Sequence, residues 1–303
     1  MNSSSLSTSF ARALQASQDA AGAQQHPTHT LYVVATPIGN LADISLRALH
    51  VLGLVDVIAC EDTRHTRQML QAYGLERPAH QLLAVHQHNE TEAAQVVLQR
   101  LAQGERVAYV SDAGTPAISD PGARLVQAVR AAGHRVLPLP GASSVTTLLS
   151  AAGITGEGFV FRGFLPSKAA ERQHAVQALV QESRAVVVLE APHRIAALAE
   201  ALALLGERPV TVGRELTKQF EQIVRLAAQD LSAWLAERPE HQRGEFVLVV
   251  HDQPVAAAQG EGERILRCLL AELPLKTAVK LAAEISGEPR NALYERALSL
   301  KPG

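Results

Sequence analysis

The chain has 303 residues, of which 47% are apolar and 19% are charged, and its formal net charge is -2. This length is enough for two domains with sizeable cores, and the composition excludes a mainly disordered protein. The near-neutral net charge argues against a uniformly basic nucleic-acid binder.

The first segment, residues 1–29, is polar and rich in Ala, Ser and Gln, and it lacks the apolar core of a signal peptide. We therefore expect a disordered leader. No run of 18 apolar residues occurs, so no membrane span is expected. Cys60 and Cys268 cannot form a disulfide framework, and no Cys/His group has zinc spacing. A cytoplasmic protein without a metal or a membrane contact is expected.

Strands and helices are predicted to alternate through the first domain, residues 30–152. Apolar runs predict strands at Leu31–Ala35, Asp56–Cys60, Leu82–Val85, Arg106–Val110 and Arg135–Leu139. Two helices are predicted with a cap: Ile44–Leu52 after Asp43, and one from Pro121 to Gly133 after the N-cap Asp120. Three more are predicted, one ending near Gly74, one over Thr91–Gln103 and one ending at Gly153. This alternation indicates a mostly parallel sheet that is covered on both faces.

The loop after the predicted strand Arg106–Val110 is the most informative stretch of this domain. Residues 111–122 read SDAGTPAISDPG, which is too rich in Gly, Pro, Ser and Asp to continue the strand. In open α/β sheets, loops at the carboxyl ends of strands bind ligands. The alternative is an ordinary long connection, although most connections need fewer residues.

A second α/β domain, residues 153–252, begins at the break over residues 153–158. Its strands are predicted at Phe159–Phe164, Ala185–Leu189, Val210–Val212, Ile223–Leu226 and Phe246–Val250, with helices after Ser167, Arg194 and Asp230. Both domains are therefore expected to be α/β units with mostly parallel sheets.

The last part of the chain consists of a linker, residues 253–263, and a tail, residues 264–303. The tail holds seven Lys and Arg and four Glu, so its net charge is +3, which leaves -5 for the remaining residues. The amphipathic segments Lys276–Ser286 and Pro289–Leu300 predict a helix-turn-helix or, equally well, a plain helical hairpin. A basic tail permits a local contact with nucleic acid.

Five loops with unusual polar or Gly/Pro content lie at predicted strand ends: Thr36–Asp43, Glu61–Arg67, Ser111–Gly122, Glu190–Arg194 and Arg214–Lys218. Because the carboxyl ends of parallel strands share one edge, the loops of each domain should converge on a cleft that binds a ligand. The structural alternatives are a solvated helix start for Glu61–Arg67, an ion-pair network for Arg214–Lys218 and a tight turn for Glu190–Arg194.

Several kinds of site find no support in the sequence. It contains no P-loop, no GxGxxG and no GxSxG motif. His86 and His88 have no evident third ligand, so surface histidines are expected there. Asp112 can accept a hydrogen bond from a ribose or an amine. The residues alone predict a two-domain α/β protein with a small-molecule cleft.

Six motifs, in order, resemble those of one family, the RsmI group of ribosomal small-subunit RNA methyltransferases within the tetrapyrrole methylase superfamily. They are LYVVATPIGNL at 31–41, CEDTR at 60–64, SDAGTP at 111–116, LPGASS at 139–144, EAPHRI at 190–195 and RELTK at 214–218. The resemblance spans residues 31–250, and the tail resembles the terminal helix-turn-helix of the group. Leu189 departs from the pattern, since an aromatic residue usually stands there, and this affects only a local stacking contact.

The resemblance implies that S-adenosylmethionine, the methyl donor, binds between two α/β domains without a metal. It implies transfer to the ribose 2′-hydroxyl of a cytidine in the decoding region of 16S ribosomal RNA, and a homodimer. Donor-pocket residues carried over by motif are Pro37, Asp112, Gly114, Thr115, Ser119, Ser143, Ser144, Phe161, Ala191, Pro192 and Arg214.

The residues expected to face the RNA are Glu61, Asp62, Arg64, His65 and Lys218. A ribose hydroxyl is a poor nucleophile until its proton is removed or shared. Lys218 or Glu215 is expected to accept or orient that proton. We expect the assembled 30S subunit to be the substrate, because a body with a charge of -5 should bind naked RNA weakly.

Two other functions stay open. One is methylation of a tetrapyrrole on the same scaffold; such enzymes usually carry a GxGPG-like loop after the first strand, where this chain has Thr36–Asn40. The other is a non-catalytic RNA-binding assembly factor that keeps the donor pocket as a relic.

Overall fold

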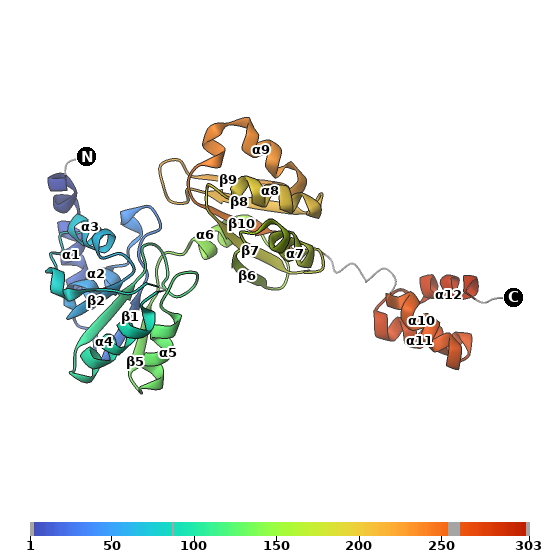
Figure 1. Cartoon of the computed structure of the whole chain (residues 1–303), viewed down its shortest axis with the longest axis horizontal. Coiled ribbons are helices and arrows are strands. Elements are labelled where there is room, and N and C mark those ends of the chain that lie inside the picture. The colour runs from blue at the N-terminus through green and yellow to red at the C-terminus, as the bar shows by residue number, and fades with distance from the viewer. Residues whose placement is uncertain (1–2, 87, 254–260, 301–303) are drawn as a thin grey trace.

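The computed structural model describes residues 3–86, 88–253 and 261–300, which form two sheet-based lobes and a helical tail (Figure 1). The first sheet has the order β3-β2-β4-β1-β5, and all its pairings are parallel. Its strands are β1 (Thr30–Val34), β2 (Val57–Cys60), β3 (Leu82–Ala84), β4 (Arg106–Val110) and β5 (Arg135–Leu139). The predicted parallel sheet of the first domain is confirmed.

Helices cover both faces of this sheet, which is why its central strands read as continuous apolar runs. One face packs against α2 (Leu46–Leu54) and α3 (Thr63–Ala72), and the other against α4 (Glu90–Ala102) and α5 (Ala123–Ala131). Two short 3-10 turns complete the lobe, η1 (Leu41–Asp43) and η2 (Ala79–Gln81).

The first helix, α1 (Ser3–Ala21), corrects the expectation of a disordered leader. Phe10, Ala13 and Leu14 pack on the core beneath α2 and α3, and the Phe10 ring meets the Tyr73 ring edge-on at 5.0 Å. The polar composition hid an apolar stripe with helical spacing, which is partly buried because it packs against the core of the lobe.

Two helix starts also differ from their predictions. Ser45, and not Asp43, caps α2 by accepting a hydrogen bond from the backbone N–H of Ala48. Helix α5 begins after Gly122, and Asp120 does not cap it. Instead, the Glu90 carboxylate accepts from the N–H groups of Gly122, Arg124 and Leu125 at 2.8–3.2 Å.

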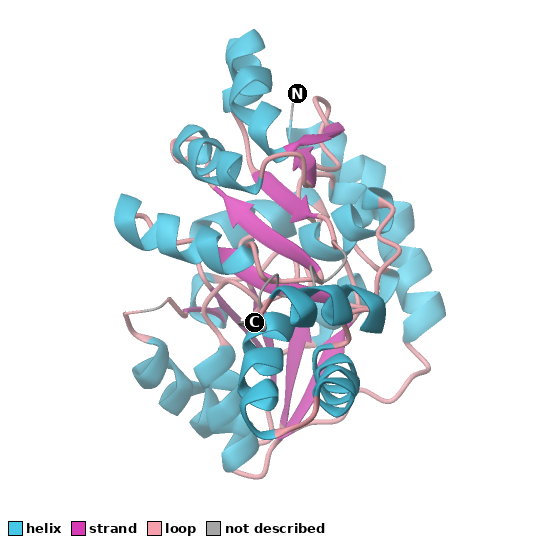
Figure 2. Cartoon of the chain, turned by 90° about the vertical axis from the view of Figure 1, so that its right-hand side faces the viewer, coloured by secondary structure: helices cyan, strands magenta, loops and turns pink. Residues whose placement is uncertain are grey.

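The second sheet has the order β6-β7-β10-β8-β9. Figure 2 shows the strands in magenta with helices in cyan around them. Its strands are β6 (Phe159–Phe164), β7 (Ala185–Glu190), β8 (Pro209–Arg214), β9 (Gln222–Ala227) and β10 (Phe246–Val250). Only β6 and β7 pair in parallel within the described residues, so this sheet is mixed and not mostly parallel. The last strand, β10, inserts antiparallel between β7 and β8, and β8 and β9 form a hairpin.

Insertion of β10 still brings the two predicted loops of this lobe together. Strands β7 and β8 both run opposite to β10, so they run in the same direction and end at the same edge. Glu190 at the end of β7 and Arg214 at the end of β8 both pair with Phe246. The loops that follow these strands therefore converge, as predicted.

The outer face of the second sheet packs against α7 (Ala169–Leu179), α8 (Ile195–Leu202) and α9 (Leu231–Glu237). The short turns of this lobe are η3 (Ala203–Leu205), η4 (Ala228–Asp230) and η5 (Pro239–Gln242). The other face packs against α6 (Ser144–Ala152), whose Val145 and Leu148 join a cluster with Val187 and Val249. Although α6 precedes the predicted boundary at Gly153, its side chains belong to the second lobe.

The tail holds three helices, α10 (Glu261–Glu272), α11 (Leu275–Ser286) and α12 (Arg290–Ser299), where two were predicted. They share a core of their own that includes Leu266, Val279 and Leu293. Of the predicted linker, residues 254–260 lie outside the described residues, and its last residues belong to α10. No described helix is both long and apolar enough to span a bilayer.

Candidate functional site

A cavity of about 440 Å³ lies between the two lobes. Its first-lobe wall comes from the loops after β4 and β5, and its second-lobe wall from the end of β7, the segment after β8 and the start of β10. The volume falls within the usual range for small-molecule sites. We call it the first cavity.

The structure brings eight of the eleven predicted donor residues to this cavity: Asp112, Gly114, Thr115, Ser119, Ser143, Ser144, Ala191 and Pro192. They come from three loops that follow β4, β5 and β7, and two of these strands belong to one lobe and one to the other. The convergence of loops inferred from the sequence accounts for this placement.

Close backbone packing shapes the first-lobe wall. Gly114 has φ of +81° and exchanges two backbone hydrogen bonds with Thr36, at 2.9 and 3.0 Å. A Cβ at Gly114 would lie 3.3 Å from Cγ2 of Ile38, and one at Gly141 would lie 2.8 Å from Cβ of Ala35. Both glycines thus allow loops that a larger residue would displace.

Three predicted donor residues lie outside the wall of the first cavity. Pro37 lines a neighbouring cavity, and Phe161 packs into the apolar cluster behind the wall. The Arg214 guanidinium is buried and donates to the backbone oxygens of Arg243 and Phe220 and to Oε1 of Gln222. Arg214 therefore holds loops of the second lobe together through three hydrogen bonds.

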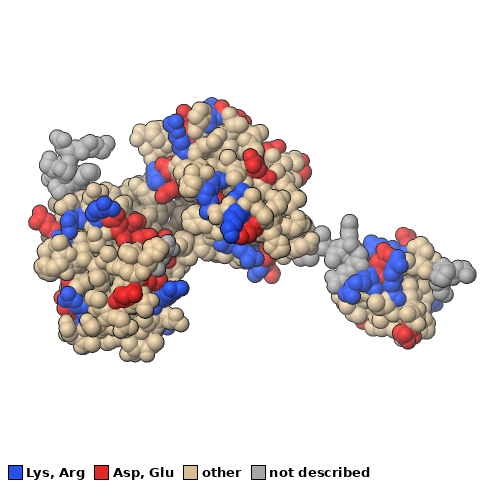
Figure 3. Space-filling model, viewed as in Figure 1, with Lys and Arg blue, Asp and Glu red and all other residues tan. Residues whose placement is uncertain are grey.

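The first cavity is more acidic than the sequence suggested. Glu61, Asp112, Asp120 and Glu245 line it, and no Lys or Arg is among its described lining residues. Glu190 also belongs to the lining, but its side chain is fully buried and Oε1 pairs with Arg194 at 3.0 Å. The sequence pattern assigned Glu61 to the RNA and did not single out Asp120, Glu190 or Glu245 as site residues. On the visible face of the molecule, acidic side chains gather on the side of the first lobe that faces the second (Figure 3).

Two of these carboxylates hold their protons more tightly than usual. Burial, followed by repulsion from Asp112, raises the pKa of Glu61, and burial likewise raises the pKa of Asp120. In addition, Oε2 of the buried Glu190 has no hydrogen-bond partner among the described residues. A cavity with these walls favours a ligand that carries positive charge and hydrogen-bond donors.

A second cavity of about 540 Å³ adjoins the first. Ile38, Asp112, Ala113 and Glu245 line both cavities, so these four residues mark the junction between them. The remaining lining residues of the second cavity are Pro37, Gly39, Leu41, His65, Gln68, Met69, Ala72 and Lys218.

The residues expected to face RNA are therefore divided. His65 and Lys218 line the second cavity, and Glu61 lines the first. Asp62 caps α3 by accepting from the N–H groups of Arg64 and His65, and it pairs with the exposed Arg64 guanidinium at 3.0 Å. These contacts of Asp62 agree with the structural alternative for Glu61–Arg67, a solvent-exposed helix start.

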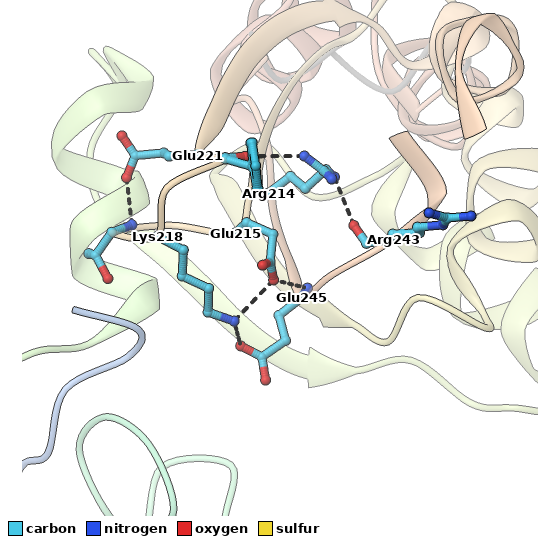
Figure 4. A network of polar contacts seen from close by, with 8 residues as sticks. Arg214, Glu215, Lys218, Glu221, Arg243 and Glu245 are labelled. Carbon is cyan, nitrogen blue, oxygen red and sulfur yellow. Dashed lines mark hydrogen bonds and ion pairs between the residues drawn. The ribbon is translucent and has the colours of Figure 1, made fainter. Parts of the chain in front are cut away.

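Lys218 stands between two carboxylates (Figure 4). Its Nζ lies 3.0 Å from Oε1 of Glu215 and 2.9 Å from Oε2 of Glu245. Burial alone would lower the pKa of Lys218, but hydrogen bonds to Glu245 and Glu215 raise it above the ordinary value. The Glu215 carboxylate also accepts a hydrogen bond from the N–H of Glu245. Burial alone would raise the pKa of Glu215, but this hydrogen bond and the nearby Lys218 lower it. Lys218 is thus held in its protonated, donating form.

Backbone geometry fixes this network from both sides. Glu215 and Thr217 have φ of +51° and +67°, a left-handed conformation that non-glycine residues rarely adopt. A Cβ at Gly39 would lie 2.4 Å from Cγ of Lys218, and one at Gly244 would lie 2.4 Å from Cγ of Glu215. Strained residues and close glycine contacts of this kind often accompany functional sites.

Metal ligation finds no support in the described part of the chain, where no group of three or more His, Cys, Asp and Glu side chains is placed to hold an ion.

Comparison with known families identifies two matching models. The model of the Tetrapyrrole (Corrin/Porphyrin) Methylases matches residues 30–232, and the model of the RsmI C-terminal HTH domain matches residues 256–301. The first match covers both lobes from β1 into α9, and the second covers the helical tail.

Individual proteins agree with these matches. A Pseudomonas aeruginosa protein named ribosomal RNA small subunit methyltransferase I is 48% identical over 278 residues, 89% of this chain and 96% of that protein. Cobalt precorrin-4 methyltransferase has the same fold, with a TM-score of 0.54 and 18% identity over 73% of this chain and 94% of that one. So does uroporphyrin-III C-methyltransferase from Thermus thermophilus complexed with S-adenosyl homocysteine (TM-score 0.50, 18% identity, 73% and 96% coverage).

Proposed function

Because this chain belongs to the tetrapyrrole methylase family, and within it to the RsmI-type ribosomal RNA small subunit methyltransferases, we propose that it methylates a cytidine of 16S ribosomal RNA on the ribose 2′-hydroxyl. The structural observation that supports this proposal is a pair of adjoining cavities, one for a methyl donor and one for a nucleoside acceptor.

The first cavity suits S-adenosylmethionine. When bound, this donor supplies a methyl group on a positively charged sulfonium. The backbone around Gly114, the hydroxyls of Ser119 and Ser143, and the loop at Ala191 are placed to hold it. The acidic walls favour its positive charges.

The second cavity is proposed to hold the acceptor nucleoside. Its walls combine apolar contacts from Leu41 and Met69 with polar groups from His65 and Gln68. If the protein holds the hydroxyl oxygen in line with the methyl carbon and the sulfur, a bimolecular step becomes effectively unimolecular. Such positioning can contribute about 7–11 kcal/mol to the lowering of the barrier.

We further propose that the substrate is the assembled 30S subunit, that the enzyme is a cytoplasmic homodimer, and that the tail assists RNA binding. The charge distribution supports the first point, since the tail carries +3 and the rest of the chain -5. A body with this charge is poorly suited to bind naked RNA through phosphate contacts alone.

The experiment combines donor binding with methyl transfer. Calorimetry should show binding of S-adenosylmethionine, and labelled methyl groups should enter 30S subunits from cells that lack this modification. Label should locate to a cytidine ribose, and protein-free 16S RNA should react more slowly. Labelling of a porphyrin precursor instead of RNA would favour the tetrapyrrole alternative. Absence of donor binding would favour an assembly factor with a relic pocket.

A further inference from the structure

We propose that the Glu245 carboxylate accepts the proton of the attacking ribose hydroxyl, and that Lys218 is the residue that positions this carboxylate. The inference rests on the proposed function and names the residue that would take the proton in that reaction. It differs from the prediction from sequence, in which Lys218 or Glu215 accepts or orients the proton.

The first argument is position. Methyl transfer has to take place where the donor and acceptor cavities meet. Of the four residues that line both cavities, two are ionisable, Asp112 and Glu245. A proton acceptor within reach of the attacking oxygen is therefore one of these two carboxylates.

The second argument distinguishes these two carboxylates. Oδ1 of Asp112 accepts from the N–H of Asp62, and Asp112 stands beside Glu61 and Asp120 on the acidic wall that suits the cationic donor. Glu245 lies on the other lobe, and its side chain is 73% exposed. Only its Oε2 is engaged, by Lys218 of the second cavity, and no contact of Oε1 is found among the described residues.

The third argument concerns Lys218 and Glu215. Lys218 donates to both neighbouring carboxylates, so it keeps its proton and cannot serve as the base. Oε1 of Glu215 accepts from both Lys218 and the N–H of Glu245, and Glu215 lines neither cavity. Glu215 therefore anchors Lys218, and Lys218 in turn fixes the direction of the Glu245 carboxylate (Figure 4).

The proposed step balances in atoms and charge. The hydroxyl oxygen forms a bond to the methyl carbon as the carbon–sulfur bond breaks, and the sulfonium becomes a neutral thioether. The hydroxyl proton passes to Glu245 and from there to solvent, which the exposed side chain reaches directly. No oxidant, reductant or further reactant is needed.

The first test compares Glu245→Gln with the control Glu240→Gln, which removes an exposed carboxylate of the same lobe outside both cavities. Single-turnover methylation of unmodified 30S subunits is measured at saturating donor. Glu245→Gln should react about 10²–10⁴-fold more slowly than the wild type, and its rate should rise with hydroxide concentration, because hydroxide replaces the lost base. Glu240→Gln should match the wild type.

The second test examines the role of Lys218 by chemical rescue. Added formate should restore part of the rate of Glu245→Gly, because formate can occupy the vacated place beside the Lys218 ammonium. The double variant Glu245→Gly/Lys218→Met should not be rescued, since no cation remains to hold the formate. Equal rescue of both variants would show that Lys218 does not position the carboxylate.

The outcomes separate this inference from the proposed function. If the wild type binds no S-adenosylmethionine or labels no 30S subunit, the proposed function fails. If the wild type is active and Glu245→Gln behaves like Glu240→Gln, only the assignment of Glu245 fails. The assignment also fails if Asp112→Asn, and not Glu245→Gln, shows the hydroxide-dependent rate.

Discussion

Gly39 illustrates how a single missing side chain shapes the site. Its backbone passes against the stem of Lys218, so a Cβ there would lie 2.4 Å from Cγ and 2.9 Å from Cε of that side chain. Gly39→Ala should therefore displace Lys218 and slow methylation of 30S subunits at least tenfold, while the calorimetric affinity for S-adenosylmethionine stays within about twofold.

Gly53→Ala is a matched control for this substitution. Gly53 lies within α2, where the nearest atom to an added Cβ is 3.5 Å away, an ordinary contact. Alanine there should stabilise the protein by about 0.5–1 kcal/mol in thermal unfolding and leave activity unchanged. Equal activity of Gly39→Ala and Gly53→Ala would contradict the role assigned to the Lys218 position.

Protonation of Glu61 and Asp120 should couple donor binding to pH. The pKa of each carboxyl lies above its ordinary value, 4.5 for Glu61 and 3.8 for Asp120. A cationic donor favours the ionised forms, so its binding should lower both pKa values and release protons. The affinity should fall as the pH drops through the raised values, which calorimetry over a pH series in buffers of different ionisation enthalpy can measure.

The stability of the donor-free protein should change in the opposite direction. Between the ordinary and the raised pKa values the folded state binds more protons than the unfolded state, so stability should fall as the pH rises through that window. Glu61→Gln should remove part of both effects. Proton release that is unchanged in Glu61→Gln would exclude this carboxyl as a source.

At the residue scale, local motifs predicted loop members well and long-range partners poorly. Gly114 and Ser143 lie where their strand-end loops suggested. Arg214, which the motif assigned to the donor pocket, bonds elsewhere, and its partners include the Arg243 carbonyl, 29 residues away. Glu245 was missed because only the insertion of β10 between β7 and β8 brings it to the site, and no local pattern specifies that insertion.

Among the elements, α5 depends on a cap that comes from a different helix. Glu90, on α4, accepts from three backbone N–H groups at the start of α5, directly after the donor loop. Glu90→Ala leaves these donors without that partner and should destabilise the protein by about 1–3 kcal/mol in chemical unfolding. Glu92→Gln, an exposed change on the same helix, should stay within about 0.5 kcal/mol of the wild type.

The substitution Glu90→Ala should also change the loop that precedes α5. Residues 112–115 and 118–120 of this loop line the first cavity, and the loop ends at Gly122, one of the N–H donors to Glu90. Glu90→Ala should therefore weaken donor binding as well, and saturating donor should recover part of the lost stability. If unfolding shifts while donor affinity stays constant, the loop is held by other contacts.

The elements also show where sequence patterns reach their limit. The alternation of strands and helices predicted the succession of elements in the first lobe and its parallel pairing, but not the order of the strands in the sheet. The same pattern wrongly favoured parallel pairing in the second lobe. The sequences of strands Phe246–Val250 and Gln222–Ala227 do not reveal whether they run parallel or antiparallel to their neighbours. Helix α1 was missed because its apolar stripe, Phe10, Ala13 and Leu14, is sparse within a polar segment.

At the scale of the whole molecule, the two lobes are joined by shared packing as well as by the chain. Helix α6 follows the last strand of the first sheet, yet Leu148 packs in the cluster on the second sheet. Ile38 from the first lobe lies in that same cluster with Leu216. One apolar cluster therefore holds the cavity walls relative to one another, which suits a site that has to align two ligands.

The tail provides the last prediction. Its three helices enclose their own core, and on the face that Figure 3 shows, Lys and Arg side chains cluster on the tail. Lys276 and Lys280 are exposed on α11. If the tail contacts phosphates, Lys276→Gln/Lys280→Gln should weaken binding to 30S subunits and reduce the slope of log affinity against log salt by about 2, since each lost phosphate contact removes about 1.

Two controls distinguish loss of phosphate contacts from unfolding of the double lysine variant. Donor affinity should be unchanged, because no residue of α10–α12 lines the first cavity. Glu284→Gln, which removes the carboxylate 3.9 Å from Lys280, should leave the salt slope unchanged or make it steeper. A double lysine variant with the wild-type salt slope would show that these two side chains do not contact the RNA, and the tail would then act through its shape or through another face.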